Sequence, residues 1–352
     1  MRFVISRIQR FRDVVRRRLG IWLFDRKKDS SFDLTEAESI LFIRNDAKLG
    51  DAIVSSGVIR KLRKYRPDLK VMVLTTPGMM QSLFLEHFGV DRVINLSKRP
   101  SYKEIRGVSQ QVGSVDVVVS LNPDMKMKDI YLMKCLHSKA NVGLDSELKL
   151  INFKINKNLD KKHYAEKFDY ISKLVGIDKP KENYMVPLIK ESLDKAQQFL
   201  DDNGINDFVL VNPFGSGNER KLNKASITKI IDAVKDNGPA PHVILLSAPD
   251  TKELLDSMSL TSGMTHHFDQ SDSIYDAIAM VEKAKLVVSV DTSIVHIASG
   301  LEKKQISIYR SDPMNFANWS PNSEFSIVLE SGIGINSFSK EELKSSFSKL
   351  DL

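Results

Sequence analysis

The sequence predicts an α/β protein of two domains, each built around a parallel β-sheet. A length of 352 residues suits two domains better than one. Short runs rich in apolar and β-branched residues alternate with amphipathic helical stretches, and this alternation occurs twice along the chain. Apolar residues make up 42% of the composition and charged residues 28%, so each domain can bury a core of ordinary size.

The first alternating series begins near residue 39, and the second begins after residue 205. Buried parallel strands are expected at 40–44, 71–75, 92–96 and 116–121, and then at 208–212, 242–247, 286–290 and 305–309. Amphipathic helical stretches lie between them, for example at 51–66 and 78–88. Each series is typical of repeated βαβ units, and we therefore expect two Rossmann-like domains with a cleft between them.

A charged, proline-containing stretch, DKPKENYMVP, separates the two series and is interpreted as a linker. The expected organisation is a basic amphipathic N-terminal segment (1–30), an N-terminal Rossmann-like domain (38–178), a linker (179–190), a C-terminal Rossmann-like domain (191–335) and a C-terminal helix (336–352).

The net charge of +7 is concentrated at the N-terminus. Residues 1–28 carry ten basic and two acidic side chains, which leaves the other 324 residues at −1. A nucleic-acid-binding protein normally carries its basic patch on the folded domain, so no nucleic-acid partner is expected. The single cysteine, Cys135, excludes an intramolecular disulfide and suits the cytoplasm.

The N-terminal segment also has an apolar stripe with helical spacing: Val4, Ile8, Phe11, Val15 and Leu19. Arginines interrupt every apolar run, so neither a signal peptide nor a transmembrane helix is predicted. One interpretation is an amphipathic helix that lies on an anionic membrane surface and is separable from the folded domains. The other is a surface helix that packs on the protein through this same stripe.

Polar residues follow three of the predicted strands, where open parallel sheets bind their ligands. After the first strand come Gly50, suited to a tight turn, and Asp51, which either caps the next helix or takes part in chemistry. This turn lacks the GxGxxG pattern, so a dinucleotide-dependent dehydrogenase is disfavoured.

The junction after residues 286–290 contains Asp291, Thr292, Ser293 and, one helical turn later, His296. The backbone amides at such a helix start suit a diphosphate. The alternative is a capped helix with a hydrogen-bonded histidine.

The third junction, after residues 208–212, contains Gly215, Arg220 and Lys221, which could clamp phosphate oxygens or belong to a solvated loop. The chain has no Asp-x-Asp sequence and no His/Cys cluster with metal-ligand spacing. We therefore expect chemistry without a metal or another cofactor.

Three runs resemble glycosyltransferase family 9, the lipopolysaccharide heptosyltransferases. ILFIRNDAKLGDAIVSSGVIRKLRKYRPDLKVMVLT resembles the first βαβ unit of the family, with its Gly-Asp pair. LVVSVDTSIVHIASGLEKKQISIY resembles the C-terminal signature, and WSPNSEFSIVL continues the similarity, so that the resemblance covers roughly 38–330. The basic N-terminal extension and the Lys-Leu-Gly-Asp motif are most similar to the outer-core branch.

The resemblance implies a GT-B fold, an ADP-heptose donor and inverting transfer to a core sugar of lipopolysaccharide at the inner face of the inner membrane. It implies that Asp51 is the catalytic base. It assigns nucleotide-sugar binding to Asp291, Thr292, Ser293, His296 and a cation, Arg220 or Lys221. Family members usually place a basic residue before a Trp here, whereas this sequence has Leu222.

Two other functions remain compatible with the residues. The enzyme could use another nucleotide-hexose donor in surface-glycan synthesis, since nothing in the sequence separates heptose from hexose. A catalytically silent, membrane-associated binding protein could keep the same fold, although the presence of both motifs speaks against it.

Overall fold

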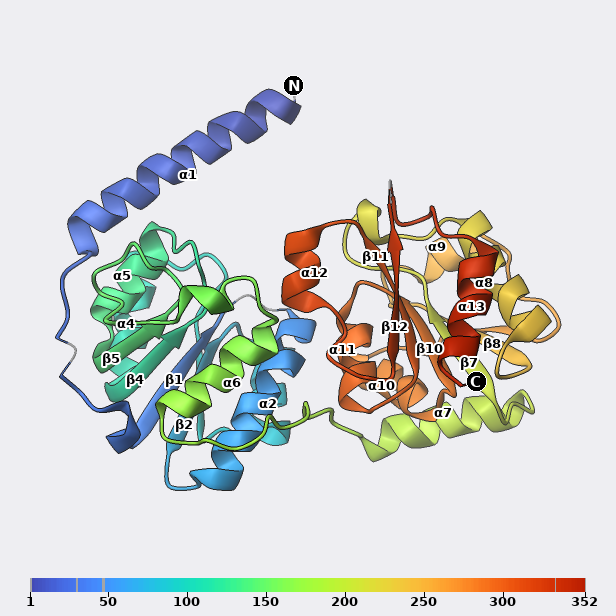
Figure 1. Ribbon diagram of the computed structural model, residues 1–352, viewed down its shortest axis with the longest axis horizontal. Helices are drawn as coiled ribbons and strands as arrows, with labels where there is room; N and C mark the ends of the chain where they lie inside the picture. Colours follow the sequence, from blue (N-terminus) through green and yellow to red (C-terminus); the bar gives the residue numbers. More distant parts are fainter. Residues whose placement is uncertain (1, 30, 46–47, 333, 352) are drawn as a thin grey trace. The chain divides into compact units, whose positions relative to one another are not determined.

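The computed structural model describes residues 2–29, 31–45, 48–332 and 334–351, with the backbone alone for residues 2–8 and 10. The chain divides into two compact units, Met1–Glu182 and Asn183–Leu352 (Figure 1). Each unit contains a six-stranded sheet in which neighbouring strands are parallel. The predicted α/β fold with two Rossmann-like parallel sheets is confirmed.

The sheet of the first unit has the strand order β3-β2-β1-β4-β5-β6. Its strands are β1 (Ser39–Arg44), β2 (Lys70–Thr75), β3 (Arg92–Asn95), β4 (Ser114–Ser120), β5 (His137–Gly143) and β6 (Phe153–Lys154). Its helices are α1 (Arg2–Phe24), α2 (Leu49–Tyr65), α3 (Met79–Ser82), α4 (Tyr102–Val112), α5 (Met127–Cys135) and α6 (Tyr164–Leu174). Helix α2 packs against α6, and α5 packs against both α1 and α4.

The second unit repeats this plan with the strand order β12-β11-β10-β7-β8-β9. Its strands are β7 (Phe208–Asn212), β8 (His242–Leu246), β9 (Thr265–Phe268), β10 (Leu286–Val290), β11 (Gln305–Arg310) and β12 (Ser326–Ser331). Its helices are α7 (Lys190–Asp202), α8 (Lys224–Asn237), α9 (Lys252–Asp256), α10 (Ile274–Lys283), α11 (Ser293–Gly300), α12 (Pro313–Trp319) and α13 (Lys340–Lys349).

The eight predicted strands are all present, and they include the four central ones, β1, β4, β7 and β10. The prediction missed β5, β6, β9 and β12. Three of these are edge strands, which are buried less completely and therefore carry weaker apolar patterns. The fourth, β5, reads HSKANVG and begins with residues that are exposed or half-buried.

Each sheet has a topological switch point, and the two switch points occupy equivalent positions in the strand order. In each unit the first and fourth strands lie side by side, and the chain progresses outward from that pair in opposite directions. Ligands of such sheets bind beyond the carboxyl ends of the strands at this point. The switch points of this protein lie at β1 and β4 in the first unit and at β7 and β10 in the second.

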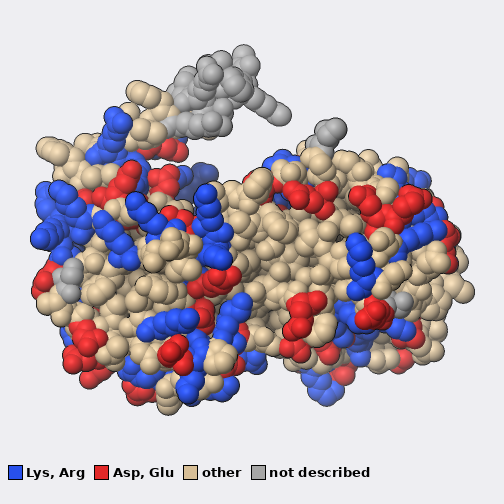
Figure 2. Space-filling view, in the orientation of Figure 1, with Lys and Arg blue, Asp and Glu red and all other residues tan. Residues whose placement is uncertain are grey.

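The two units carry opposite net charge. Residues 1–182 contain 36 basic and 22 acidic side chains, a net charge of +14, whereas residues 183–352 contain 16 and 23, a net charge of −7. The nearly neutral remainder inferred for residues 29–352 therefore hides a basic and an acidic half. On the face drawn in Figure 2, Lys and Arg side chains gather over the unit that contains α1.

The described part of the apolar stripe of α1 faces solvent. Phe11, Val15 and Leu19 are 72%, 47% and 44% exposed, and Trp22, on the same side, is 72% exposed. The side chains of Val4 and Ile8 lie outside the description. The interpretation that α1 packs on the protein through this stripe is therefore wrong for the described part of the stripe. Among the described residues, no helix is long and apolar enough to cross a membrane.

The opposite side of α1 is attached to the first unit. Ile21 and Phe24 pack against its apolar core, and the Asp25 carboxylate accepts hydrogen bonds from the amides of Lys149 and Leu150 at 3.0 and 2.8 Å. The expectation that residues 1–28 are separable is contradicted by these contacts, because removing the segment would uncover core residues. The sequence pattern missed this second face because it combines polar and apolar residues.

Candidate functional site

Asp51 lies at the switch point of the first unit. It is the third residue of α2, whose N-cap position is occupied by Lys48, and the backbone of Gly50 is helical. The N-cap interpretation of Asp51 and the tight-turn role of Gly50 are therefore wrong. A carboxylate in the first turn of a helix is stabilised by the helix dipole without acting as the cap.

The carboxylate of Asp51 faces a buried arginine. Its Oδ2 lies 3.9 Å from Nη2 of Arg44, the last residue of β1. The guanidinium of Arg44 also lies 5.3 Å from the ring centroid of Phe168 on α6, a distance suited to a cation–π contact. The Asp51 side chain is 16% exposed and that of Arg44 7%. The acid is thus held by a neighbouring charge and still reaches the surface.

At the switch point of the second unit, Asn212 connects the ends of β7 and β10. Its amide nitrogen donates to Ser289 Oγ and Thr292 Oγ1, each at 2.9 Å. Thr292 is the N-cap of α11 and accepts from the amide of Ile294 at 3.2 Å, and Ser293 is the first residue of that helix. The predicted capped helix is therefore present, and hydrogen bonds hold its start in place.

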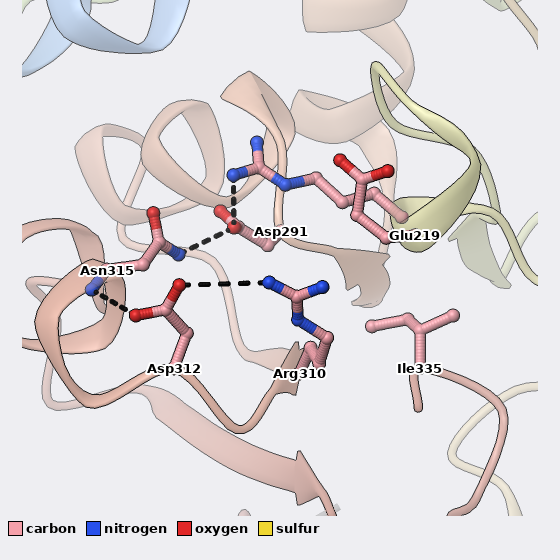
Figure 3. A pocket seen from close by; sticks show the side chains of 7 residues that line it. Glu219, Asp291, Arg310, Asp312, Asn315 and Ile335 are labelled. Carbon is pink, nitrogen blue, oxygen red and sulfur yellow. Dashed lines mark hydrogen bonds and ion pairs between the residues drawn. The ribbon is translucent and has the colours of Figure 1, made fainter. Parts of the chain in front are cut away.

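Asp291 lines a small pocket beside this helix start (Figure 3). Its Oδ2 lies 3.2 Å from Nη2 of Arg220 and accepts from the side-chain amide of Asn315 at 2.9 Å. Asp291 is buried, whereas the Arg220 side chain is 35% exposed. The structure thus brings together two of the predicted site residues, Asp291 and Arg220, which are 71 positions apart in the sequence.

The pocket is also lined by Arg310, Asp312 and Asn315, which were not among the predicted site residues. Arg310 ends β11, and its Nη2 lies 3.8 Å from Asp312 Oδ2. Asp312 caps α12 by accepting from the amide of Asn315 at 3.0 Å, and Pro313 follows as the first helical residue. The signal that could have found them is the run Arg-Ser-Asp-Pro directly after a predicted strand, a helix-start pattern.

The loop that carries Arg220 folds back on itself. Gly215 donates its amide to the carbonyl of Arg220 at 2.8 Å, and Phe214 pairs with Lys221 in an antiparallel bridge. A Cβ on Gly215 would lie 2.9 Å from Cβ of Arg220 and 3.0 Å from Cγ2 of Thr292. Glycine thus lets the loop approach the start of α11 closely. The expectation of a merely solvated loop is wrong for Arg220.

Lys221 is arranged differently from its neighbour. It lies outside the lining of the pocket, and its backbone carbonyl accepts from the side chain of Asn336 at 3.3 Å. The next residue, Leu222, is 2% exposed and belongs to the apolar core. Position 222 is therefore a packing position in this chain.

His296 lies on the buried side of α11, where it is 4% exposed. Its ring packs edge to face on Trp319 of α12, with 6.1 Å between the ring centroids. The carbonyl of Trp319 accepts from the hydroxyl of Tyr309 at 2.8 Å. Burial is the main reason that the pKa of Tyr309 lies well above its usual value, and the nearby charge of Asp291 raises it further. This aromatic layer fixes α12, and therefore Asn315, against the site.

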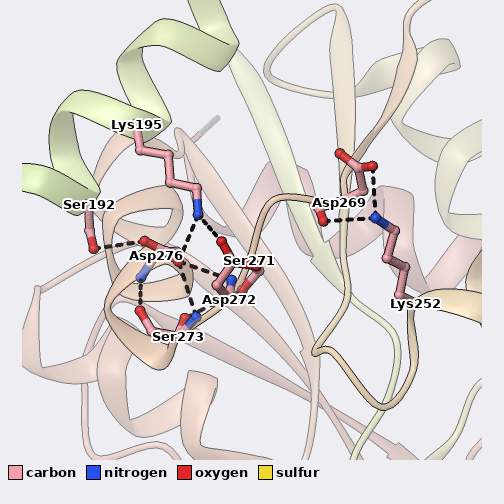
Figure 4. A network of polar contacts seen from close by, with 8 residues as sticks. All are labelled: Ser192, Lys195, Lys252, Asp269, Ser271, Asp272, Ser273 and Asp276. Atoms are coloured by element: carbon pink, nitrogen blue, oxygen red, sulfur yellow. Dashed lines mark hydrogen bonds and ion pairs between the residues drawn. The ribbon is translucent and has the colours of Figure 1, made fainter.

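A second polar network holds the segment that follows β9 (Figure 4). Asp276 accepts from Ser192 Oγ at 2.8 Å, from the amide of Ser273 at 3.1 Å and from Lys195 Nζ at 3.2 Å. Burial alone would raise the pKa of Asp276, but the hydrogen bonds with Ser192 and Lys195 outweigh it and lower that pKa. The carboxylate is satisfied, which identifies the network as a structural tie between α7 and α10.

Ser247, His267 and Asp256 form a hydrogen-bonded chain with the order found in serine hydrolases. Ser247 Oγ lies 2.8 Å from His267 Nε2, and His267 Nδ1 lies 2.9 Å from Asp256 Oδ1. However, Ser247 is only 4% exposed, and the amide of Ala248 already donates to Thr251 Oγ1 at 3.0 Å. A buried nucleophile whose neighbouring amide is occupied does not support acyl transfer.

In the parts of the chain that the structure describes, no three His, Cys, Asp or Glu side chains gather closely enough to hold a metal ion. Arg220 and Arg310 are cations that line the pocket. The prediction of metal-independent chemistry stays a prediction.

The sequence profile of glycosyltransferase family 9 (heptosyltransferase) matches residues 105–342, more than half of the chain. The chain belongs to glycosyltransferase family 9. This family 9 enzyme is a glycosyltransferase, as its sequence motifs predicted. The matched region contains Arg220, Asp291, Arg310 and Asn315, whereas Asp51 precedes it.

Relatives of this family 9 glycosyltransferase cover most of its length. A protein of Escherichia coli (strain K12) with the provisional name lipopolysaccharide heptosyltransferase 4 is 25% identical over 310 residues, which is 85% of this chain and 83% of that protein. A family 9 glycosyltransferase of Veillonella parvula DSM 2008 has a similar fold, with a TM-score of 0.74, 16% identity and coverage of 92% of this chain and 99% of that chain.

The E. coli heptosyltransferase WaaC with ADP is also similar, with a TM-score of 0.66, 17% identity and coverage of 89% of this chain and 99% of that chain. At these identities the solved structures show the shared fold, which is the two-sheet architecture of GT-B glycosyltransferases.

Proposed function

We propose that this enzyme transfers heptose from ADP-heptose to a core sugar of lipopolysaccharide with inversion at the anomeric carbon. The observation that carries the proposal is the placement of Asp51 at the switch point of the first unit, partly exposed and 3.9 Å from Arg44. Membership of the heptosyltransferase family supports the sugar. The ADP in the WaaC structure supports the nucleotide.

Inverting transfer needs a single in-line displacement. The acceptor hydroxyl attacks the anomeric carbon as the bond to the diphosphate breaks, and a base takes the hydroxyl proton. Asp51 suits this base because its carboxylate reaches the surface at the ligand-binding end of the sheet. Arg44, buried beside it, places a positive charge 3.9 Å from the Asp51 carboxylate.

The nucleotide-sugar is proposed to bind at the switch point of the second unit. Amides at the start of α11, which follows Thr292 and begins at Ser293, suit phosphate oxygens. Arg220 offers a partly exposed guanidinium next to them, and Arg310 offers a second one. We propose Arg220, rather than Lys221, as the cation that stabilises the departing diphosphate, because Arg220 lines the pocket.

His296 and Asp291 have supporting roles in this proposal. Asp291 orients Arg220 and Asn315 through Oδ2. His296 is buried against Trp319, so it shapes the floor of the nucleotide site from behind α11. Gly215 contributes by letting the backbone of its loop pass close to Thr292 at the start of α11.

The partner that we propose for α1 is the anionic inner surface of the inner membrane. The stripe of Phe11, Val15, Leu19 and Trp22 faces solvent. At about 100° per residue, Arg12 and Arg16 fall on one flank of this stripe and Arg18 on the other, and all three are exposed. An apolar stripe flanked by arginines suits an interfacial helix, with apolar side chains among the acyl chains and guanidinium groups at the phosphates.

The proposed function is tested by a donor panel. Purified enzyme is incubated with a delipidated lipopolysaccharide core oligosaccharide and with ADP-heptose, ADP-hexose, UDP-hexose or GDP-hexose. We expect transfer from ADP-heptose alone and a product whose anomeric configuration, determined by NMR, is opposite to that of the donor. Transfer from a hexose donor would favour the alternative enzyme, and absence of transfer from all donors would favour the silent binding protein.

A further inference from the structure

Among the described side chains of α1, Arg17 makes the most hydrogen bonds and ion pairs, and the proposed chemistry gives it no role. Its Nη1 and Nη2 bind both carboxylate oxygens of Asp145, at 2.8 and 3.0 Å. Nη2 also donates to Glu147 at 2.9 Å, and Nε lies 3.2 Å from Asp124. A further hydrogen bond runs from Nη1 to the carbonyl of Met125.

These partners belong to two separate loops. Asp124 and Met125 follow β4, and Asp145 and Glu147 follow β5. Asp145 also accepts from the amide of Met125 at 2.9 Å, so the two loops are joined through the carboxylate that Arg17 holds. Because β4 is the neighbour of β1 in the sheet, the first loop lies at the switch point that also contains Asp51.

The surroundings show that this contact is built into the fold. Asp145 is 1% exposed, and a carboxylate buried to this degree needs a cation and hydrogen-bond donors. The hydrogen bond with Asp145 raises the pKa of Arg17, against the effect of burial. Gly20 brings α1 against α5 at one turn from Arg17, since a Cβ there would lie 2.9 Å from Cα of Met127.

The two sides of α1 therefore have different tasks. One side of the helix carries Arg17, Gly20 and Phe24. The opposite side, about 180° away, carries Phe11, Val15 and Trp22. The first set contacts the unit and the second is exposed. These contacts attach α1 to the unit beside the loops that follow the carboxyl ends of β4 and β5.

We infer that Arg17 is a positioning residue for the acceptor, because it joins α1 to the two loops that border the acceptor side of the switch point. This inference rests on the proposed function, which places the acceptor in the first unit. Helix α1 thus has a part in acceptor binding in addition to its contact with the lipid surface.

The test compares Arg17→Lys with Arg92→Lys. Both changes keep the charge, but lysine cannot reproduce the planar fork that binds Asp145. Arg92 is an exposed arginine of the same unit at the beginning of β3, away from the carboxyl ends of the strands, so it is the matched control. The measurements are kcat and KM with the delipidated core oligosaccharide, acceptor affinity and ADP affinity by calorimetry, and hydrogen exchange of the loops at 121–126 and 144–147.

For Arg17→Lys we expect a KM and a Kd for the oligosaccharide about tenfold higher, with kcat and ADP affinity close to those of the wild type. Exchange in both loops should rise. Arg92→Lys should match the wild type in every measurement. Glu147→Gln, which removes one exposed partner of Arg17, should shift the acceptor KM in the same direction by a smaller factor.

Unchanged KM and acceptor affinity in a folded Arg17→Lys protein would overturn the inference, even if its melting temperature falls, since Arg17 would then only stabilise the fold. If Arg17→Lys does not fold, Glu147→Gln decides by the same criterion. If the wild type binds the oligosaccharide without transferring heptose, the proposed function fails, while a loss of binding in the Arg17 variant still supports the inference. A wild type that binds no oligosaccharide contradicts both.

Discussion

The two units have the same strand order, but they differ in net charge and in the side chains at their switch points. The first unit carries a net charge of +14 and the second −7. At the switch point of the first, one carboxylate faces one arginine at 3.9 Å. At the switch point of the second there are two polar clusters: Asn212 binds Thr292, and Asp291 pairs with Arg220.

This difference separates what the topology contributes from what the side chains contribute. The shared strand order provides a ligand-binding site at the carboxyl ends of the strands in both units, but it does not determine which ligand binds. The basic unit suits a large anionic surface, because its charge is spread over the unit and over α1. The acidic unit repels anions at long range, so the nucleotide that we propose for it would depend on short contacts with Arg220, Arg310 and backbone amides.

The largest expected effect concerns Asp51. Asp51→Asn keeps the size of the side chain and removes its ability to accept a proton, so kcat should fall by about 10²- to 10⁴-fold. ADP affinity should stay at the wild-type value, because the nucleotide is assigned to the other unit. Steady-state kinetics and calorimetry check this. Turnover close to normal in the folded variant would leave Asp51 as a residue that only stabilises α2.

The second effect tests the network of the acidic unit. Arg220→Ala should weaken ADP binding about thirtyfold, which corresponds to about 2 kcal/mol for the loss of a charge-assisted contact. Lys221→Ala, the neighbouring variant outside the pocket, should have a clearly smaller effect. Calorimetric titration of both proteins with ADP measures the difference. Equal affinities in the two variants would remove the distinction between these cations.

A third, smaller effect concerns the surface of the basic unit. Trp22→Ser should reduce binding to vesicles that contain anionic lipid by about tenfold, since burying a large aromatic side chain contributes about 1.5 kcal/mol or more. Trp22→Phe is the conservative control and should bind nearly normally. Binding of the wild type should also weaken as salt is added, because salt screens the arginines. Co-sedimentation with vesicles measures the effect of the Trp22 variants and the effect of salt. If neither added salt nor Trp22→Ser changed vesicle binding, membrane docking through α1 would be contradicted.

The smallest expected effect is that of chelation, which should leave turnover unchanged. We propose that arginines and the start of α11 bind the diphosphate, so EDTA should remove nothing that the reaction needs. Initial rates are measured with and without EDTA, and then with added Mg²⁺ or Mn²⁺. Loss of activity that a divalent cation restores would show that the arginines of the acidic unit are insufficient.

The sequence by itself determined the central architecture of this protein. Strands β1, β2, β7 and β10 are nearly uninterrupted apolar runs because both faces of a parallel sheet are buried, and burial leaves a pattern that can be read locally. The residues after β1, β7 and β10 were found for the same reason, since their positions follow from the strand ends. The family signature around Asp291 is likewise a local pattern.

Only the tertiary structure decided which side chains meet. Asp291 pairs with Arg220 across 71 positions, and Arg17 binds Asp145 across 128. Lys48, and not Asp51, occupies the cap position of α2 because the helix begins earlier than its apolar pattern. Helix α1 has a docked side and an exposed side, and its sequence reveals only the exposed one. Ion pairs and hydrogen bonds between distant segments leave no periodic trace in either segment, because each partner is an ordinary polar residue until the fold brings them together.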